Sequence, residues 1–341
     1  MPEAQGFYGI MTGRIVNPGL SRRAVMTLAL GLPLGGCIGS SRTFNARAGA
    51  EDLAADPTLH IVTTRKLVKG GQKSPFFDAS RGSLKYARAR LEAPDGSIFG
   101  QVNTLVAGEF AVTSVDLVEG TPVTAFTEAL RGRNTLLFVH GYNQTFEAAS
   151  HDAAMLSNGI GFKGNTALFS WPSKAGLFDY GYDRESAMLA RDPLADSLAG
   201  VVQDPFGARL HLVAHSMGTL VTLEALRIFR DRHGDAGLDR VGAIVLAAPD
   251  VDADLFRAAV GHLGPWRDRM TVITATNDRA LDLSRRIAGR ERAGALGREA
   301  FEGMGIRVLD ATEFATGLIR HDAFVANADV RAAIKRVIER A

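Results

Sequence analysis

The sequence predicts an α/β fold: a mostly parallel central sheet flanked by helices, with an antiparallel N-terminal edge. From residue 135 onward, short apolar runs alternate with segments of helical periodicity, which is typical of parallel strands joined by crossover helices. The runs at 135–139 and 241–247 are apolar throughout, as strands buried on both faces are. Earlier in the chain, a Pro-Asp-Gly turn signal at 94–96 separates two extended pieces, which indicates antiparallel strands.

The composition is that of an ordinary globular chain, with 341 residues, 46% hydrophobic and 22% charged. The net charge is +2, and no basic stripe with interleaved aromatic residues is present, so the sequence offers no support for nucleic-acid binding. Only one cysteine, Cys37, occurs. An internal disulfide and a Cys-based metal site are therefore excluded.

The N-terminus has the pattern of a targeting segment. Paired arginines at 22–23 precede an apolar run at 24–34, which is too short to span a bilayer as a helix but suits the apolar part of a signal peptide. The run ends at Leu34-Gly35-Gly36-Cys37, which resembles the lipobox of a bacterial lipoprotein, whose cysteine becomes lipidated. The paired arginines also resemble a twin-Arg export signal, and the alternative is a buried helix with an inert cysteine.

This segment predicts the organisation of the whole chain. We expect residues 1–37 to be a signal peptide ending in a lipidated Cys37, and residues 38–57 to be a flexible Gly/Ala/Ser-rich tether. Residues 58–341 would form the folded domain. Acyl chains on Cys37 would then anchor the domain to a membrane of the bacterial cell envelope, on the periplasmic side.

The individual elements are expected in the following order. The N-terminal edge comprises strands at 60–65, within 91–106, and at 110–117. Continuing the chain, strands are expected at 135–139, 166–169, 210–213, 241–247, 270–276 and 306–309, and helices at 146–156, 183–202, 218–226, 253–260, 280–287 and 329–338. Pro193 predicts a break, or two separate helices, within 183–202. Residues 289–305, polar and rich in glycine, predict a mobile loop or weak helix.

The segment 210–226 contains the most informative pattern, an apolar strand, a turn of tiny residues and a helix. Its turn, Ala214-His215-Ser216-Met217-Gly218, matches the G-x-S-x-G nucleophile elbow with Ala in place of the first Gly. Such a turn strains the serine backbone and projects Oγ beside the first N–H groups of a helix. Ser216 is therefore the candidate nucleophile.

A serine nucleophile needs a base, and the base needs an orienting group. In the chain order Ser, acid, His, one histidine follows the later strands, His321. His211 lies within a strand, His215 in the elbow and His140 in the turn after strand 135–139. The remaining four histidines lie away from the expected catalytic loops; they are His60, His151, His233 and His262.

Two acids compete for the orienting role. Asp278 follows strand 270–276, while Asp250 and Asp252 follow strand 241–247. In α/β-hydrolases, which use a serine on such an elbow, the acid usually follows the penultimate strand, and this favours Asp278. The alternative role for Asp250, Asp252 and Asp254 is to form the turn and cap the next helix.

An oxyanion hole requires two backbone N–H groups aimed at the developing charge. Met217 follows the nucleophile and supplies the first. Tyr142, in the turn His140-Gly141-Tyr142, supplies the second. Trp171, Tyr180 and Tyr182 are candidates for lining an acyl pocket near the cap position at 183–202, with plain packing as the alternative.

With these residues identified, the chain resembles the bacterial α/β-hydrolases of unknown function called DUF900, which are esterase- and lipase-like. The resemblance covers about residue 60 to the C-terminus and implies the α/β-hydrolase fold with a Ser216, Asp278 and His321 triad. It rests on five stretches: LFVHGYNQTF (137–146), LFSWPS (168–173), YGYDRESA (180–187), LVAHSMGT (212–219) and NDRAL (277–281).

Three functional hypotheses follow. The first is a lipid-anchored serine hydrolase that cleaves carboxylic esters of small molecules or lipids, with no cofactor or metal required. The second is a thioesterase, amidase or acyltransferase with the same acyl-enzyme mechanism, which the triad alone does not distinguish. The third is a non-catalytic envelope lipoprotein that uses the fold as a binding module.

Overall fold

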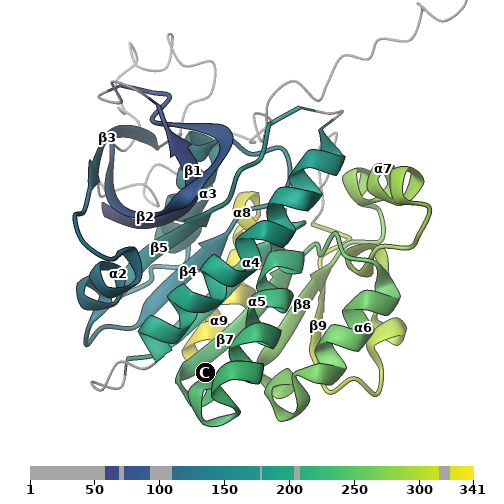
Figure 1. Ribbon diagram of the computed structural model, residues 1–341. Coiled ribbons are helices and arrows are strands. Elements are labelled where there is room, and N and C mark those ends of the chain that lie inside the picture. Colours follow the sequence, from purple (N-terminus) through teal and green to yellow (C-terminus); the bar gives the residue numbers. More distant parts are fainter. Residues whose placement is uncertain (1–57, 69–72, 93–109, 177–178, 203–207, 315–322) are drawn as a thin grey trace, which may run out of the picture. The chain divides into compact units, whose positions relative to one another are not determined.

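The computed structural model describes residues 58–68, 73–92, 110–176, 179–202, 208–314 and 323–341. Within these residues, nine strands form one sheet in the order β3-β2-β1-β5-β4-β6-β7-β8-β9 (Figure 1). Only β1 with β2 and β2 with β3 pair antiparallel; every other neighbouring pair is parallel. The sheet is thus mostly parallel with an antiparallel N-terminal edge, as the sequence predicts.

The strand bounds are β1 Thr58–Leu67, β2 Phe77–Glu92, β3 Ala111–Leu117, β4 Thr135–Val139, β5 Asn165–Ser170, β6 Leu210–His215, β7 Val241–Ala247, β8 Met270–Thr274 and β9 Arg307–Asp310. The helices are α2 Pro122–Leu130, α3 Phe146–Gly159, α4 Tyr180–Val202, α5 Gly218–His233, α6 Ala253–His262, α7 Arg279–Ala288, α8 Ala323–Ala326 and α9 Ala328–Glu339.

Helices cover both faces of the sheet, and each face has its own apolar core. In Figure 1, α4, α5 and α6 lie in front of the sheet, and α3, α8 and α9 lie behind it. Alternate residues of a buried strand serve the two cores: Leu137 and Val139 of β4 pack with the front helices, and Leu136 and Phe138 pack with the rear helices. This alternation explains why the central strands are apolar throughout.

Three of these elements were not expected from the sequence: β2, α2 and the short α8. The first half of β2 is polar and exposed, so it lacks the alternation of a half-buried strand. Its pairing with β1 forms it instead, through a register with irregularities near Arg65. The predicted strand pair around the turn at 94–96 begins inside β2, and residues 93–109 lie outside the described residues.

The predicted break at Pro193 was wrong, because α4 runs unbroken from Tyr180 to Val202. Proline removes one hydrogen bond, to the carbonyl of Leu189 four residues earlier. The side chain of Leu189 is 61% exposed and Pro193 is partly exposed, so the unbonded carbonyl lies on the water-facing side of the helix. Packing of Ala190 and Leu194 on the other side continues across the proline.

The segment at 289–305, predicted to be a mobile loop or a weak helix, contains short helical turns. Two short 3-10 turns, Ala293–Ala295 and Arg298–Phe301, occur there. The backbone of Ala293 and Gly294 donates hydrogen bonds to the carbonyls of Val251 and Pro249. The segment therefore packs against the loop that follows β7.

Residues 1–57, including Cys37, lie outside the described residues. Within the described part of the chain, no helix combines the length and hydrophobicity needed to cross a membrane.

Candidate functional site

Ser216 occupies the sharp turn between β6 and α5. Its φ of +52° lies in the left-handed region, which a residue with a side chain rarely adopts. Both of its backbone groups are held: the N–H donates to Ala247 O at 2.9 Å, and the carbonyl accepts from Thr219 N and Asp250 N. The strained conformation that the elbow pattern predicts is therefore present and is fixed by neighbouring strands.

The turn is possible because small residues let two strand ends approach closely. A Cβ on Gly218 would lie 2.4 Å from His140 O and 2.5 Å from Val139 O, both in the backbone at the end of β4. A Cβ on Gly141 would lie 2.8 Å from the Cβ of Ser216. Glycine at these two positions thus brings the turn after β4 against the turn after β6.

The oxyanion donors predicted from the sequence lie on these two turns. Met217 precedes the first residue of α5, and its N–H makes no hydrogen bond with any described residue. Tyr142 follows Gly141, and its hydroxyl donates to Gly176 O at 2.6 Å, which fixes its side chain. The turn after β4 also contains Asn143 at a φ of +60°.

His140 holds this turn as a neutral side chain. Its Nε2 accepts from Trp171 N at 3.1 Å, Nδ1 lies 2.8 Å from Gly141 O, and the ring stacks on Trp171. Burial and the nearby Arg65 guanidinium lower the pKa of His140 from 6.5 to about 3. The neutral ring thus carries its proton on Nδ1, where it donates to Gly141 O.

A buried network, which sequence reasoning missed, holds the other side of the turn. Arg65, 1% exposed, donates to Gln144 O at 2.7 Å and to Ser170 Oγ at 2.9 Å. Ser173 Oγ accepts from Gln144 N at 3.1 Å and donates to Asp183 Oδ2 at 2.5 Å. Both backbone groups of Gln144 are therefore fixed.

The charges of this network compensate each other. Asp183 also accepts from the N–H groups of Lys174 and Asn143. Burial raises the pKa of Asp183, and its hydrogen bonds and Arg65 oppose that rise. The signals for these residues were present in the sequence as an arginine inside a β-branched strand and an aspartate inside the stretch 180–187, but neither pattern specifies a partner.

Asp278 lies at the carboxyl edge of the sheet, just after β8, and is 3% exposed. Its Oδ1 accepts from the N–H groups of Ala280 and Leu281, so it caps α7. The preceding residue, Asn277, donates from its side chain to Thr312 O at 3.1 Å. The loop after β8 is thereby bonded to the loop after β9.

The competing acids after β7 have other roles. Asp252 caps α6 by accepting from Asp254 N and Leu255 N, which confirms the helix-capping interpretation for that residue. For Asp250 that interpretation was wrong, because its carboxylate is buried in an ion pair with Arg292 at 3.1 Å. Ser284 Oγ also donates to it at 2.5 Å. The Asp250 carboxylate is thus engaged by Arg292 and Ser284.

The candidate base, His321, lies outside the described residues, which end at Phe314 and resume at Ala323. The described residues on either side lie near the elbow and Asp278. Phe314 N donates to Ala311 O in the loop bonded to Asn277. The ring of Phe324, three residues after His321, lies 4.4 Å from the His215 ring, next to Ser216.

Most of the other histidines make structural contacts, as their positions suggested. His60 bonds Tyr86 OH, His151 accepts from Phe110 N, and His211 accepts from Ala243 N. Burial is the largest cause that lowers the pKa of each of these three from 6.5 to about 4. Further from the sheet, His262 bonds Asp231 and His233 contacts Phe229.

The three aromatic candidates differ in their surroundings. Trp171 is fully buried and donates to His140 O at 2.8 Å, so it packs beneath the turn after β4. Tyr182 donates to Ala79 O at 3.0 Å, and Arg81 lies over its ring. Tyr180 alone lines a depression beside Met217. A cap is not formed by α4, which packs on the sheet.

We expect Gly218→Ala to lower the free energy of unfolding by about 1–3 kcal/mol, because the new methyl meets rigid backbone carbonyls. Urea denaturation measures this. As a control, Gly261→Ala in α6, where a Cβ meets nothing within 4 Å, should leave stability equal or slightly higher. Equal stability of the Gly218→Ala protein and the wild type would contradict the close approach.

His140→Gln should change how stability depends on pH. The folded pKa of His140 is lowered, so its contribution is complete above pH 6.5 and is lost as the pH falls from 6.5 towards 3, while the unfolded chain takes up the proton. The stability difference between wild type and variant should shrink by about 2 kcal/mol from pH 7 to pH 5. Urea unfolding at both pH values tests this, and a constant difference would refute it.

Solved structures similar to this chain include a hydrolase described as CIB-like from Thermoplasma acidophilum, with 16% identity over 73% of this chain and 96% of that one and a TM-score of 0.34. An esterase from Pyrobaculum calidifontis is 14% identical over 85% and 86%, with a TM-score of 0.39. The catalytic core of an acetyl xylan esterase from Trichoderma reesei is 12% identical over 60% and 98%, with a TM-score of 0.36.

No curated protein matches the sequence. The model of one family matches residues 120–340, the region that contains both turns, Asp278 and the strands that position them. Together with the sheet order, that match identifies the chain as a member of the α/β-hydrolases of unknown function, DUF900.

Proposed function

We propose that this chain is a serine hydrolase that cleaves carboxylic esters through an acyl-enzyme. The observation that carries the proposal is the strained backbone of Ser216, held at the carboxyl edge of the sheet beside Met217, whose N–H bonds to none of the described residues. A serine backbone in the left-handed region is unfavourable, and it persists only where the surrounding structure holds it in that conformation. A serine hydroxyl beside an N–H without a partner among the described residues supports a nucleophile next to an oxyanion donor.

The proposed reaction has two halves. Ser216 Oγ attacks the ester carbonyl while His321 takes its proton, and the carbonyl oxygen becomes an oxyanion held by the N–H groups of Met217 and Tyr142. The C–O bond to the alcohol then breaks, and the alcohol leaves with the proton from His321. Water, activated by His321, attacks the acyl-enzyme and releases the acid and Ser216.

Asp278 is proposed to orient the imidazole of His321 and stabilise its charged form. Two features support this choice. Asp250 is engaged by Arg292 and Ser284, whereas Asp278 lies on the loop bonded to the segment that leads towards His321. Phe324 lies beside His215, so the chain shortly after His321 is near the nucleophile.

The full chain should react with a fluorophosphonate probe and hydrolyse short p-nitrophenyl esters. Ser216→Ala should abolish labelling, and Ser216→Ala and His321→Ala should each lower kcat/KM by roughly 10⁴-fold. Asp278→Asn should also lower kcat/KM, because the imidazole then loses its orienting carboxylate.

Matched controls are available on the surface. Ser83→Ala, at an exposed serine of β2, and His233→Ala, at the exposed end of α5, should keep wild-type labelling and turnover. A folded wild-type protein that is neither labelled nor active would favour the binding-module hypothesis. Product analysis with added alcohols or amines separates hydrolysis from acyl transfer.

We further propose that the hydrolase is anchored to the cell envelope by lipid on Cys37. The apolar run, the Leu34-Gly35-Gly36-Cys37 sequence and the tether after it support this location. The substrates within its reach would then be esters in, or at the surface of, the membrane and in the adjoining compartment.

Expression of the full chain in a bacterial host tests the anchor. Labelled fatty acid should be incorporated into the wild type, and the protein should partition into the detergent phase. Both properties should be lost in Cys37→Ser and kept in Ser41→Ala, a control four residues away. Detergent partitioning of Cys37→Ser equal to that of the wild type would contradict the proposal.

A further inference from the structure

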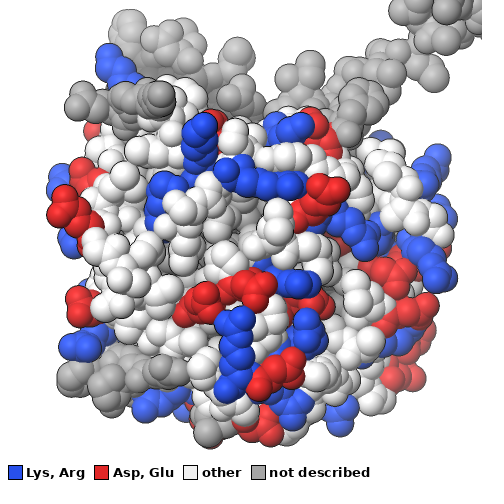
Figure 2. Space-filling model, in the orientation of Figure 1, with Lys and Arg blue, Asp and Glu red and all other residues white. Residues whose placement is uncertain are grey.

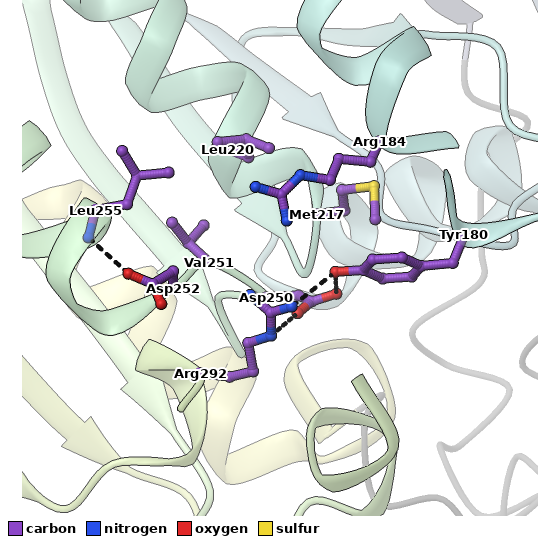
Figure 3. Close-up of a pocket in the computed structure, with 9 residues that line it drawn as sticks. All are labelled: Tyr180, Arg184, Met217, Leu220, Asp250, Val251, Asp252, Leu255 and Arg292. Atoms are coloured by element: carbon purple, nitrogen blue, oxygen red, sulfur yellow. Dashed lines mark hydrogen bonds and ion pairs between the residues drawn. The ribbon is translucent and has the colours of Figure 1, made fainter. Parts of the chain in front are cut away.

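A narrow depression lies beside Met217, the residue that follows Ser216. It opens to solvent and shares Met217 with the elbow (Figure 3). The depression encloses almost no volume, so a substrate group would lie along its lining and not inside a cavity. The lining residues come from α4, α5, α6 and the loops around Asp250 and Arg292; they are Tyr180, Arg184, Met217, Leu220, Asp250, Val251, Asp252, Leu255 and Arg292.

The two carboxylates in the lining are already compensated. Asp250 is paired with Arg292 and accepts from Ser284 and Tyr180. Asp252 accepts two N–H groups at the start of α6, and Arg290 lies 3.9 Å from its second oxygen. Hydrogen bonds to Leu255 N and Asp254 N, among other interactions, hold the pKa of Asp252 below its usual value.

Arg184 is the one cation of the lining that pairs with neither of these carboxylates. It is exposed near the start of α4, and it makes no ion pair or hydrogen bond with the described part of the chain. Other arginines of α4 and α5 differ in this respect, since Arg191 lies 3.9 Å from Glu224 and Arg232 pairs with Asp192. On the face of the molecule drawn in Figure 2, basic and acidic side chains lie next to each other.

The orientation of the Arg184 side chain indicates where it could bind a ligand. Its side chain extends from α4 above Met217 towards Leu220, so the guanidinium reaches over the depression (Figure 3). The walls beneath it are apolar at Met217, Leu220 and Val251. A ligand group that combines a short apolar chain with a terminal anion matches both surfaces.

We propose that Arg184 selects esters that carry an anionic group, a carboxylate or a phosphate, and binds that group over the depression. This inference rests on the proposed ester hydrolysis. It adds a substrate class to it, because the same depression is bounded by Met217, whose N–H is a proposed oxyanion donor. Arg184 acts on specificity and takes no part in the bond-breaking steps.

Matched ester pairs test the selectivity. The acyl pair is mono-p-nitrophenyl glutarate and p-nitrophenyl pentanoate, which have equal chain length and differ in charge. The leaving-group pair is 4-carboxyphenyl acetate and phenyl acetate. In at least one pair, the ratio of kcat/KM for the anionic to the neutral ester should fall about tenfold in Arg184→Gln and further in Arg184→Glu.

Arg191→Gln is the control on the same helix, and it should keep the wild-type ratio in both pairs. Ratios that stay unchanged in Arg184→Gln for both pairs would overturn the inference, as would an equal fall in Arg191→Gln. Inhibition of pentanoate hydrolysis by glutarate and by glycerol 3-phosphate then shows whether the anion is a carboxylate or a phosphate.

A binding measurement separates this inference from the proposed function. Calorimetry on the Ser216→Ala full chain should detect glutarate or glycerol 3-phosphate, with affinity lost about tenfold when Arg184→Gln is added. If the wild type hydrolyses no ester but this Arg184-dependent binding is found, the hydrolase proposal fails and the anion subsite stands. If the wild type hydrolyses esters and neither selectivity nor binding depends on Arg184, the hydrolase proposal stands and the anion subsite fails.

Discussion

The contact between the turns after β4 and β6 is the constraint on which the candidate site depends. Gly218 lies against the carbonyls of Val139 and His140, and Gly141 lies against Ser216. Any side chain at either glycine would push the turns apart. The contact therefore sets the distance between the nucleophile and both proposed oxyanion donors, and the backbone strain at Ser216 is one consequence of it.

Buried charges hold the surroundings of this contact. Arg65 and Asp183 reach it from β1 and α4, and they bond the backbone on both sides of Gln144. Arg292 and Asp250 pair on the other side of the elbow, under Tyr180. Burying a charge is unfavourable unless partners compensate it, and each of these groups has several. Such networks leave few alternative arrangements of the loops, which favours a preorganised site.

Sequence patterns succeeded where the local signal and the tertiary environment agree. The parallel strands and the elbow are examples, because an apolar run buried on both faces and a turn of tiny residues have few other uses. They failed where tertiary contacts override local preference. Pairing with β1 makes a strand of the polar segment around Arg81, and packing of Leu194 carries α4 past Pro193.

The sequence by itself determined the fold class, the elbow with Ser216, the turn that contains Tyr142 and the candidate acids. These depend on hydrophobic periodicity and on residues whose size alone permits a turn. Only the tertiary structure decided that Asp250 pairs with Arg292, that Arg65 and Asp183 support the turn after β4, and that Arg184 remains unpaired beside Met217 among the described residues. Asp250 and Arg292, like Arg65 and Gln144, lie more than forty residues apart in the chain and meet through the order of strands in the sheet. Hydrophobic periodicity does not encode which distant charges will face each other.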